Sequence, residues 1–204
     1  MGIERSYQAI PANSDLLDRA RANIELGELL SSARFYFADG LHEQKGPTWP
    51  PSLELGRLIR ALVVADPGLI VRGHYLEKSW GQVHRLLSAT YRGEVAGPDD
   101  ELIDVAMIGE AIIAEHVVGS QGVPVRYTRP AAVSAVAEAL LRVKPDTLRR
   151  HYDLSAMEAQ GVYKAFAGRE SEEHWAYLRE LVVGLQKFYQ EAARFGDGVL
   201  VCTD

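Results

Sequence analysis

A small set of polar and aromatic residues offers the best material for chemistry in this chain. His84 or Glu110 could serve as a general base, because imidazole and carboxylate groups can accept protons from a substrate. Arg126 could hold an anionic group, since a guanidinium presents a fixed fork of donors to a carboxylate or phosphate. The candidate binding residues are Trp80, His84, Glu110, Arg126, Tyr127 and Tyr163, with Lys78 beside them.

The same residues also have a structural interpretation, which we favour. Trp80 can pack in the core, and Arg126 can pair with an acid beside the sheet. Tyr127 and Tyr163 can satisfy buried hydroxyl groups through hydrogen bonds. We therefore assign no catalytic residue, and an enzyme is the less favoured interpretation.

The motifs that commonly bind metals and phosphates are absent from the sequence. There is no G-x-G-x-x-G, P-loop, H-E-x-x-H or G-x-S-x-G sequence, and the single cysteine, Cys202, excludes a zinc site built from several thiolates. The histidines also lack the three- or four-residue spacing that presents two ligands from one helix. A metal site would need distant segments to converge, for instance Glu110, Glu115 and His116 with His84. We predict no metal and no cofactor.

Composition indicates an ordinary globular protein. The chain has 204 residues, of which 47% are hydrophobic and 25% charged, and its formal net charge is −6. These values favour one domain with a buried core and make nucleic acid an unexpected partner. One cysteine suits a reducing compartment, and no long apolar stretch suggests export or membrane insertion. We expect a cytoplasmic protein.

Hydrophobic periodicity predicts several amphipathic helices. The clearest has apolar residues three and four positions apart from Trp175 to Ala192, with acids at its start and Gly196 as its stop. Three prolines predict a loop over 46–51. Short capped pieces should follow Asp146 and Ser155. The predicted longer helices are 13–32, 53–65, 76–90, 130–144 and 172–194.

Strands are predicted at three places. Residues 3–10 and 124–128 each precede a proline and a helix signal, and the apolar run 199–202 is typical of a strand covered on both faces. The segment 93–122 fits neither period and is left unassigned. Together these elements predict a single α+β domain, with a small antiparallel or mixed sheet packed by several helices.

Several phrases of the sequence resemble the YfbM-like family of bacterial proteins, a domain of unknown function. The resemblance covers residues 76–204, and 33–75 is interpreted as a family-variable insertion. It implies an α+β fold in a cytosolic bacterial protein, and it implies no reaction, cofactor or catalytic residue. It is carried by Leu76–Trp80 with Leu86 and Leu87, Ile108–Glu110, Val125–Thr128, Tyr152 and Asp153 with Met157, Gly161–Tyr163, Phe188–Ala193 and Gly198–Leu200.

Two functional hypotheses follow. The first is a non-catalytic binding or interaction protein that acts on another protein, with Trp49 of the proline-rich loop as the anchor for that partner. The second is a small-molecule enzyme or sensor with a pocket between the Trp80 helix and the Arg126 strand. Convergence of His84, Glu110 and Arg126 in one pocket would favour the second hypothesis.

Overall fold

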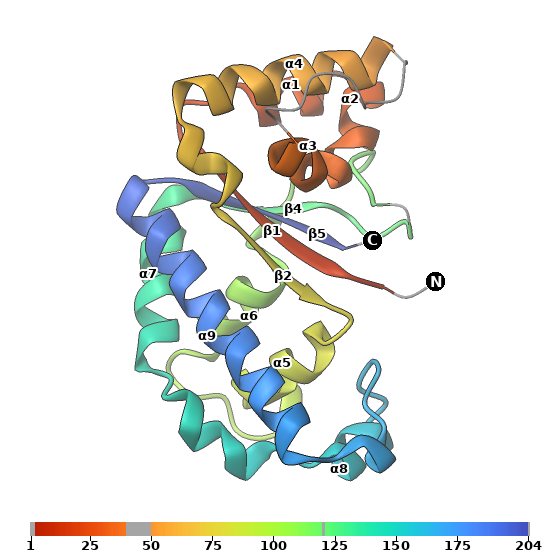
Figure 1. Ribbon diagram of the computed structural model, residues 1–204, viewed down its shortest axis with the longest axis vertical. Coiled ribbons are helices and arrows are strands. Elements are labelled where there is room, and N and C mark those ends of the chain that lie inside the picture. Colours follow the sequence, from red (N-terminus) through yellow and green to blue (C-terminus); the bar gives the residue numbers. More distant parts are fainter. Residues whose placement is uncertain (1–2, 40–49, 120, 204) are drawn as a thin grey trace.

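A five-stranded antiparallel sheet forms the middle of the protein in a computed structural model, which describes residues 3–39, 50–119 and 121–203. The strand order is β2-β1-β5-β4-β3. Figure 1 shows helices on both faces of this sheet, so the architecture has three layers. The strands are β1 (Arg5–Ile10), β2 (Gly73–Glu77), β3 (Ala111–Ile112), β4 (Arg126–Thr128) and β5 (Gly198–Thr203).

Strands β1 and β5 are the buried centre of the sheet, and every residue of both is buried. Side-chain alternation sends Tyr7 to one face, where its hydroxyl donates to the Met107 carbonyl oxygen at 3.1 Å. Gln8 points to the other face, where Nε2 donates to the Leu69 carbonyl oxygen at 3.0 Å. The predicted strands near both ends of the chain are confirmed.

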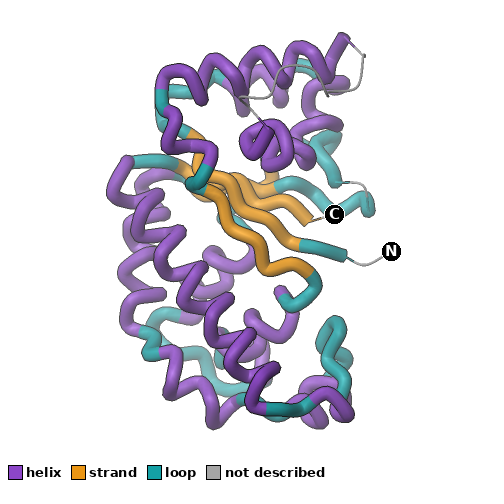
Figure 2. Tube along the Cα trace, in the orientation of Figure 1, coloured by secondary structure: helices purple, strands orange, loops and turns teal. Residues whose placement is uncertain are grey.

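The two helical layers differ in origin. Residues before β2 supply the layer on the Gln8 face, and residues after β2 supply the layer on the Tyr7 face (Figures 1 and 2). The first layer contains α1 (Leu16–Ala22), α2 (Ile24–Leu29), α3 (Ala33–Asp39) and α4 (Pro50–Ala65). The second contains α5 (Trp80–Leu87), α6 (Asp100–Ile108), α7 (Pro130–Arg142), α8 (Leu154–Ala159) and α9 (Glu172–Phe195).

Helix α9 forms where the periodicity predicts it. The Ser171 side chain accepts a hydrogen bond from the His174 backbone at its start, and Gly196 ends it with φ of 68°. One stripe of the helix is buried against β2, β5 and α7. Helix α7 also begins at the predicted proline. These two helices pack against each other and against β2 and β5.

The prediction of one helix over 76–90 is wrong at its start. Residues 73–77 are strand β2, paired with β1, and α5 begins only at Trp80. Leu76 keeps helical spacing with Trp80, but its burial comes from the sheet. The left-handed backbone of Glu77, with φ of 46°, ends the strand before the helix.

Two further boundaries differ from the sequence prediction. The predicted helix over 13–32 is divided at Asn23, whose extended backbone ends α1 and whose side chain caps α2. The predicted loop over 46–51 overlaps α4, which starts at Pro50 because proline is tolerated in a first helical turn. Trp49 and the rest of that loop lie outside the described residues.

The segment 93–122, left unassigned, contains α6 and β3. The two short helices predicted to be capped by Asp146 and Ser155 have other N-cap residues, Lys144 and Asp153. Asp146 makes an ion pair with Arg179 at 2.6 Å, whereas Asp153 caps α8 by accepting a hydrogen bond from the Ala156 backbone at 2.8 Å. Short polar residues cap helices only where the backbone turns suitably, which a sequence pattern alone does not specify.

The predicted α+β fold is confirmed, and the interpretation of 33–75 as an insertion stays a prediction. Across the described ranges, none of the helices combines the length and apolar character that crossing a membrane requires.

Candidate functional site

Trp80 and Tyr163 form a stacked pair at the beginning of α5. Their ring centroids are 5.6 Å apart at an angle of 21°. The Trp80 indole donates to the Ile3 carbonyl oxygen at 3.3 Å, and the Tyr163 hydroxyl accepts from the Ile3 backbone N–H at 2.6 Å. The guanidinium of Arg5 lies over the indole, with its Cζ 4.1 Å from the ring centroid. Both aromatic residues therefore secure the chain leading into β1, in agreement with their structural interpretation.

His84 is buried and makes its polar contact with a carboxylate that the sequence did not single out. Its Nε2 lies 2.8 Å from Oδ1 of Asp104 on α6, and its ring stacks on Tyr91 with centroids 4.3 Å apart. Burial lowers the pKa of His84, and Asp104 opposes that shift. A neutral imidazole donating to Asp104 fits this environment.

Arg126 and Glu110 lie side by side but do not form an ion pair with each other. Arg126 donates to the carbonyl oxygens of Gly109 and Glu110 at 3.2 and 3.1 Å. The Glu110 carboxylate instead binds Arg129, which keeps the pKa of Glu110 low. The expectation that Arg126 pairs with an acid is therefore wrong, because the turn after α6 offers it two carbonyl groups.

Tyr127 occupies the opposite face of the sheet from Arg126, as expected for adjacent residues of a strand. Its hydroxyl lies against the backbone of Gly198, at a point where an added Cβ would come within 1.8 Å of the Tyr127 oxygen. Burial raises the pKa of the Tyr127 hydroxyl. Tyr127 therefore helps to pack the sheet and does not share a site with Arg126.

The sequence-predicted residues thus do not converge on one reaction centre. Glu110 and Arg126 come together, and His84 contacts Asp104 of the same cleft. Trp80 and Tyr163 stack on each other elsewhere, and Tyr127 lies on the opposite face of the sheet. This arrangement weakens the hypothesis that His84 or Glu110 acts as a base on a substrate held by Arg126.

Glu110 and Arg126 do line a cleft, which we call the acidic cleft. It has a volume of about 370 Å³, within the range of small-molecule pockets. Its walls come from the segment after α5, from α6, from the turn before β3 and from the first residue of β4. The lining residues are Thr90, Ala96, Asp100, Glu101, Asp104, Val105, Ile108, Gly109, Glu110 and Arg126.

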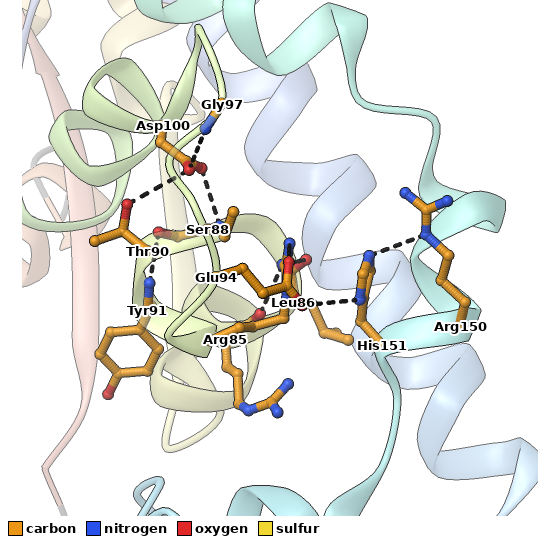
Figure 3. A network of polar contacts seen from close by, with 12 residues as sticks. Arg85, Leu86, Ser88, Thr90, Tyr91, Glu94, Gly97, Asp100, Arg150 and His151 are labelled. Carbon is orange, nitrogen blue, oxygen red and sulfur yellow. Dashed lines mark hydrogen bonds and ion pairs between the residues drawn. The ribbon is translucent and has the colours of Figure 1, made fainter.

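Asp100 fastens one wall of the acidic cleft (Figure 3). Its carboxylate accepts hydrogen bonds from the backbone N–H groups of Ala89 and Gly97 at 3.0 and 2.9 Å, and from the Thr90 hydroxyl at 3.4 Å. Only 7% of Asp100 is exposed. Both oxygens of this carboxylate already accept hydrogen bonds from the loop between α5 and α6, so its role is structural.

Arg92 and Glu94 fasten the same loop from its other side. Arg92 donates to the carbonyl oxygens of Arg85 and Leu86 at 3.1 and 2.9 Å and pairs with Glu94 at 2.8 Å. Glu94 in turn lies 4.0 Å from His151 (Figure 3). The wall is consequently held before any ligand arrives, which favours binding.

Two carboxylates and one guanidinium keep binding capacity toward the cleft. Asp104 is 35% exposed and uses Oδ1 for His84, and Glu101 is exposed. Arg126 uses Nε and one terminal nitrogen for carbonyl groups, which leaves its other terminal nitrogen available. The cleft therefore presents charges of both signs beside the apolar side chains of Val105 and Ile108.

Sequence reasoning missed Asp104 and Glu101. Both lie in the segment that was left unassigned, and acidic residues on an exposed helix face are common. A three-residue spacing on one helix was the available signal, but its use required knowing that α6 exists. Within the described residues, no group of three or more histidine, cysteine or acidic side chains is placed to hold a metal ion.

Comparison with known proteins agrees with the resemblance seen in the sequence. In solved structures, the chain is similar to the protein of unknown function YfbM from Escherichia coli, with a TM-score of 0.53 and 16% identity. The match covers 97% of this chain and 98% of YfbM, and at this identity it supports the fold alone. No curated protein matches the sequence. A family model described as "Domain of unknown function (DUF1877)" matches residues 60–202, so the chain belongs to the DUF1877 family and has a YfbM-like fold.

Proposed function

We propose that this protein is a non-catalytic binding protein and that its ligand is a small zwitterion held in the acidic cleft. The observation that carries the proposal is that Asp104 and Arg126 line the same cleft and that each keeps a polar atom available for a ligand, one carboxylate oxygen and one terminal nitrogen. An ammonium group would approach the free oxygen of Asp104. A carboxylate would approach the free terminal nitrogen of Arg126, because guanidinium and carboxylate groups match in shape and charge.

The size and lining of the cleft support a small ligand. A volume of about 370 Å³ is at the lower end for ligand pockets, which suits a molecule of amino-acid size. Val105 and Ile108 provide apolar surface for a short side chain between the two charged ends. A ligand with both charges leaves neither Asp104 nor Arg126 desolvated without a partner, which limits the cost of binding.

Binding without catalysis fits the state of the nearest titratable groups. His84 is engaged by Asp104 and stacked on Tyr91, so it is not free to move a proton to a ligand. Glu110 is held as a carboxylate by Arg129. We also propose that the protein acts in the cytoplasm and does not bind nucleic acid, in keeping with its single cysteine and net charge of −6.

Thermal unfolding with a panel of amino acids and related zwitterions tests the proposal. A ligand at about 100 times its Kd should raise Tm by roughly 5–10 °C, since binding to the native state adds to its stability. The corresponding simple amine and simple carboxylate, each tested alone, should produce a smaller shift.

Two substitutions separate the two ends of the ligand. Arg126→Gln and Asp104→Asn should each weaken binding of the selected zwitterion by at least about tenfold, the loss expected for one charged hydrogen bond. Arg57→Gln and Glu25→Gln make the same charge changes at exposed positions outside the cleft and should leave Kd within about twofold. Absence of any zwitterion binding tighter than about 1 mM, or equal losses in the controls, would overturn the proposal.

A further inference from the structure

A second cleft lies at the other end of α5, and we call it the basic cleft. Its volume is about 290 Å³, and it is formed by the turn between β2 and α5, the segment after α8 and the beginning of α9. Its walls carry the cationic side chains of Lys78, Lys164 and Arg169, together with Gln82 and His174. No carboxylate belongs to the described lining, although the protein as a whole has an excess of acids.

Two of the three cations have no acidic partner to neutralise them. In the described part of the chain, no carboxylate lies within ion-pair distance of Lys164 or Arg169. Both instead lie beside the ring of Phe166, at 5.9 and 5.2 Å from its centroid. Lys78 has a weak contact with Glu4 at 3.6 Å. The cleft therefore keeps a net positive charge that an anion can use.

A buried amide joins the two sides of the basic cleft. Gln82 is only 2% exposed, and its Nε2 donates to the Lys164 carbonyl oxygen at 2.7 Å. Its Oε1 lies 2.9 Å from Nε2 of His174 and can only accept, so this histidine nitrogen carries the shared hydrogen. Gln82 thereby fixes Lys164 and His174 relative to each other across the cleft.

We propose that the basic cleft binds a small molecule bearing a phosphate group. Phosphate oxygens accept several charge-assisted hydrogen bonds at once, which suits a convergence of two lysines and one arginine. The amino end of α5 lies at the same cleft, and its dipole adds a further attraction for negative charge. This proposal is independent of the zwitterion site, because the two clefts share no lining residue.

The size of the basic cleft favours a small phosphorylated molecule over a phosphate carried on a protein or nucleic acid. At about 290 Å³ it can enclose a phosphate ester or a diphosphate with a short organic group. Leu154 and Phe166 supply apolar surface for that group. The overall excess of acidic residues would repel a polyanionic macromolecule from the surrounding surface.

Isothermal titration calorimetry of the protein with inorganic phosphate and with pyrophosphate, at low ionic strength, tests this proposal. Both probes should bind the wild type, and affinity should fall as salt is added. The double variant Lys164→Gln/Arg169→Gln should weaken pyrophosphate binding by roughly 100-fold, about tenfold for each lost cation. Both side chains are exposed, so the variant should fold normally.

A matched control carries the same change in net charge elsewhere. Lys144→Gln/Lys187→Gln removes two exposed cations that line neither cleft, and it should leave the pyrophosphate Kd within about twofold. Equal weakening in both double variants would show attraction by net charge only and would overturn the site. Failure of the wild type to bind either probe would also overturn it.

The two proposals fail in different ways. Asp104→Asn should leave pyrophosphate binding intact, and Lys164→Gln/Arg169→Gln should leave zwitterion binding intact. Loss of pyrophosphate binding in Asp104→Asn would contradict an independent basic site, whatever the outcome of the zwitterion experiment.

Discussion

The acidic and basic clefts lie at opposite ends of α5, and they differ in how the protein treats its own charges. In the acidic cleft, Asp100, Asp104 and Glu110 are each engaged by protein donors. In the basic cleft, Lys164 and Arg169 lie beside aromatic rings and have no ion-pair partner among the described residues. Most carboxylates of the acidic cleft thus already have protein partners, and only a few of their atoms are left for a ligand. The basic cleft instead keeps uncompensated positive charge that a ligand can bind.

Each cleft also has a histidine in contact with one of its lining residues, but only His174 itself lines its cleft. His84 is hydrogen-bonded to Asp104 of the acidic cleft, and His174 to Gln82 of the basic cleft. Burial is the largest influence on both and lowers the pKa of each imidazole. The next influence differs in sign, since Asp104 raises the pKa of His84 and Arg169 lowers that of His174. Local charge therefore distinguishes two otherwise similar imidazoles.

The largest effect is expected from Asp100→Ala, which breaks the framework of the acidic cleft. The substitution removes one acceptor from two backbone N–H groups and a hydroxyl, and the site is too buried for water to replace it freely. We expect a loss of about 4 kcal/mol in unfolding free energy, measured by urea denaturation. Pyrophosphate binding at the basic cleft should persist in the folded variant.

Asp99→Ala is the control for this substitution. Asp99 is the neighbouring residue, but its partner is the exposed Arg142, so the change should cost less than about 1 kcal/mol. Equal losses for the two variants would contradict the view that Asp100 holds the loop.

A pH-dependent loss of stability should come from His74, which lines neither cleft. Burial lowers the pKa of His74 from 6.5 to about 4, so between these values the unfolded state binds more protons than the folded state. The unfolding free energy should therefore fall by about 3 kcal/mol as the pH drops from 6.5 to 4, with smaller contributions from His84, His151 and His174. Urea denaturation across this range measures the slope.

His74→Asn separates this contribution from those of the other histidines. Asparagine keeps a side-chain donor near the backbone of Leu181 and cannot titrate. The variant should be less stable at neutral pH because it leaves a gap, but its stability should change less between pH 6.5 and 4. An unchanged slope would assign the acid sensitivity to other groups.

Gly109→Ala should disturb the acidic cleft at its Arg126 end. Gly109 has φ of 82°, and an added Cβ would lie 2.7 Å from Cβ of Arg126. We expect a cost of about 2 kcal/mol from backbone strain and crowding, together with weaker zwitterion binding. Thermal unfolding and calorimetry of one variant measure both.

Gly161→Ala distinguishes strain from crowding. Gly161 has φ of 70° and nothing within 4 Å of an added Cβ, so its substitution carries the strain alone. The loss of unfolding free energy in Gly161→Ala should be smaller than that in Gly109→Ala by roughly 1 kcal/mol. If both variants lose the same unfolding free energy, the contact between the added Cβ and Arg126 costs nothing, and the loss comes from backbone strain alone.

The sequence predicted the long elements better than the clefts. Helices α7 and α9 follow an unambiguous helical period, and the continuous apolar run in β5 indicates a strand that is covered on both faces. The end of strand β2 was mistaken for the start of a helix, because Leu76 satisfies both patterns and only pairing with β1 decides between them. Local periodicity carries no information about which distant strand is available.

The candidate site was predictable only in part for the same reason. Glu110 and Arg126 were identified and do share a cleft, but Asp104 lies in a segment with no clear period. The basic cleft was also missed, although Lys78 and Tyr163 were noted nearby. Its cations come from segments separated by more than 80 positions, and no spacing rule connects Lys78 with Lys164 and Arg169. Convergence of that kind is a property of the fold.

The smallest expected effects test the comparison of the two histidines directly. Asp104→Asn should lower the pKa of His84, because the variant loses the charge that stabilises the imidazolium. Arg169→Gln should raise the pKa of His174, since the repelling cation is gone. Both changes should be small, because both partners are partly solvated. NMR titration of the imidazole signals resolves both changes, and no shift in either variant would show that burial alone sets these pKa values, with no part for Asp104 or Arg169.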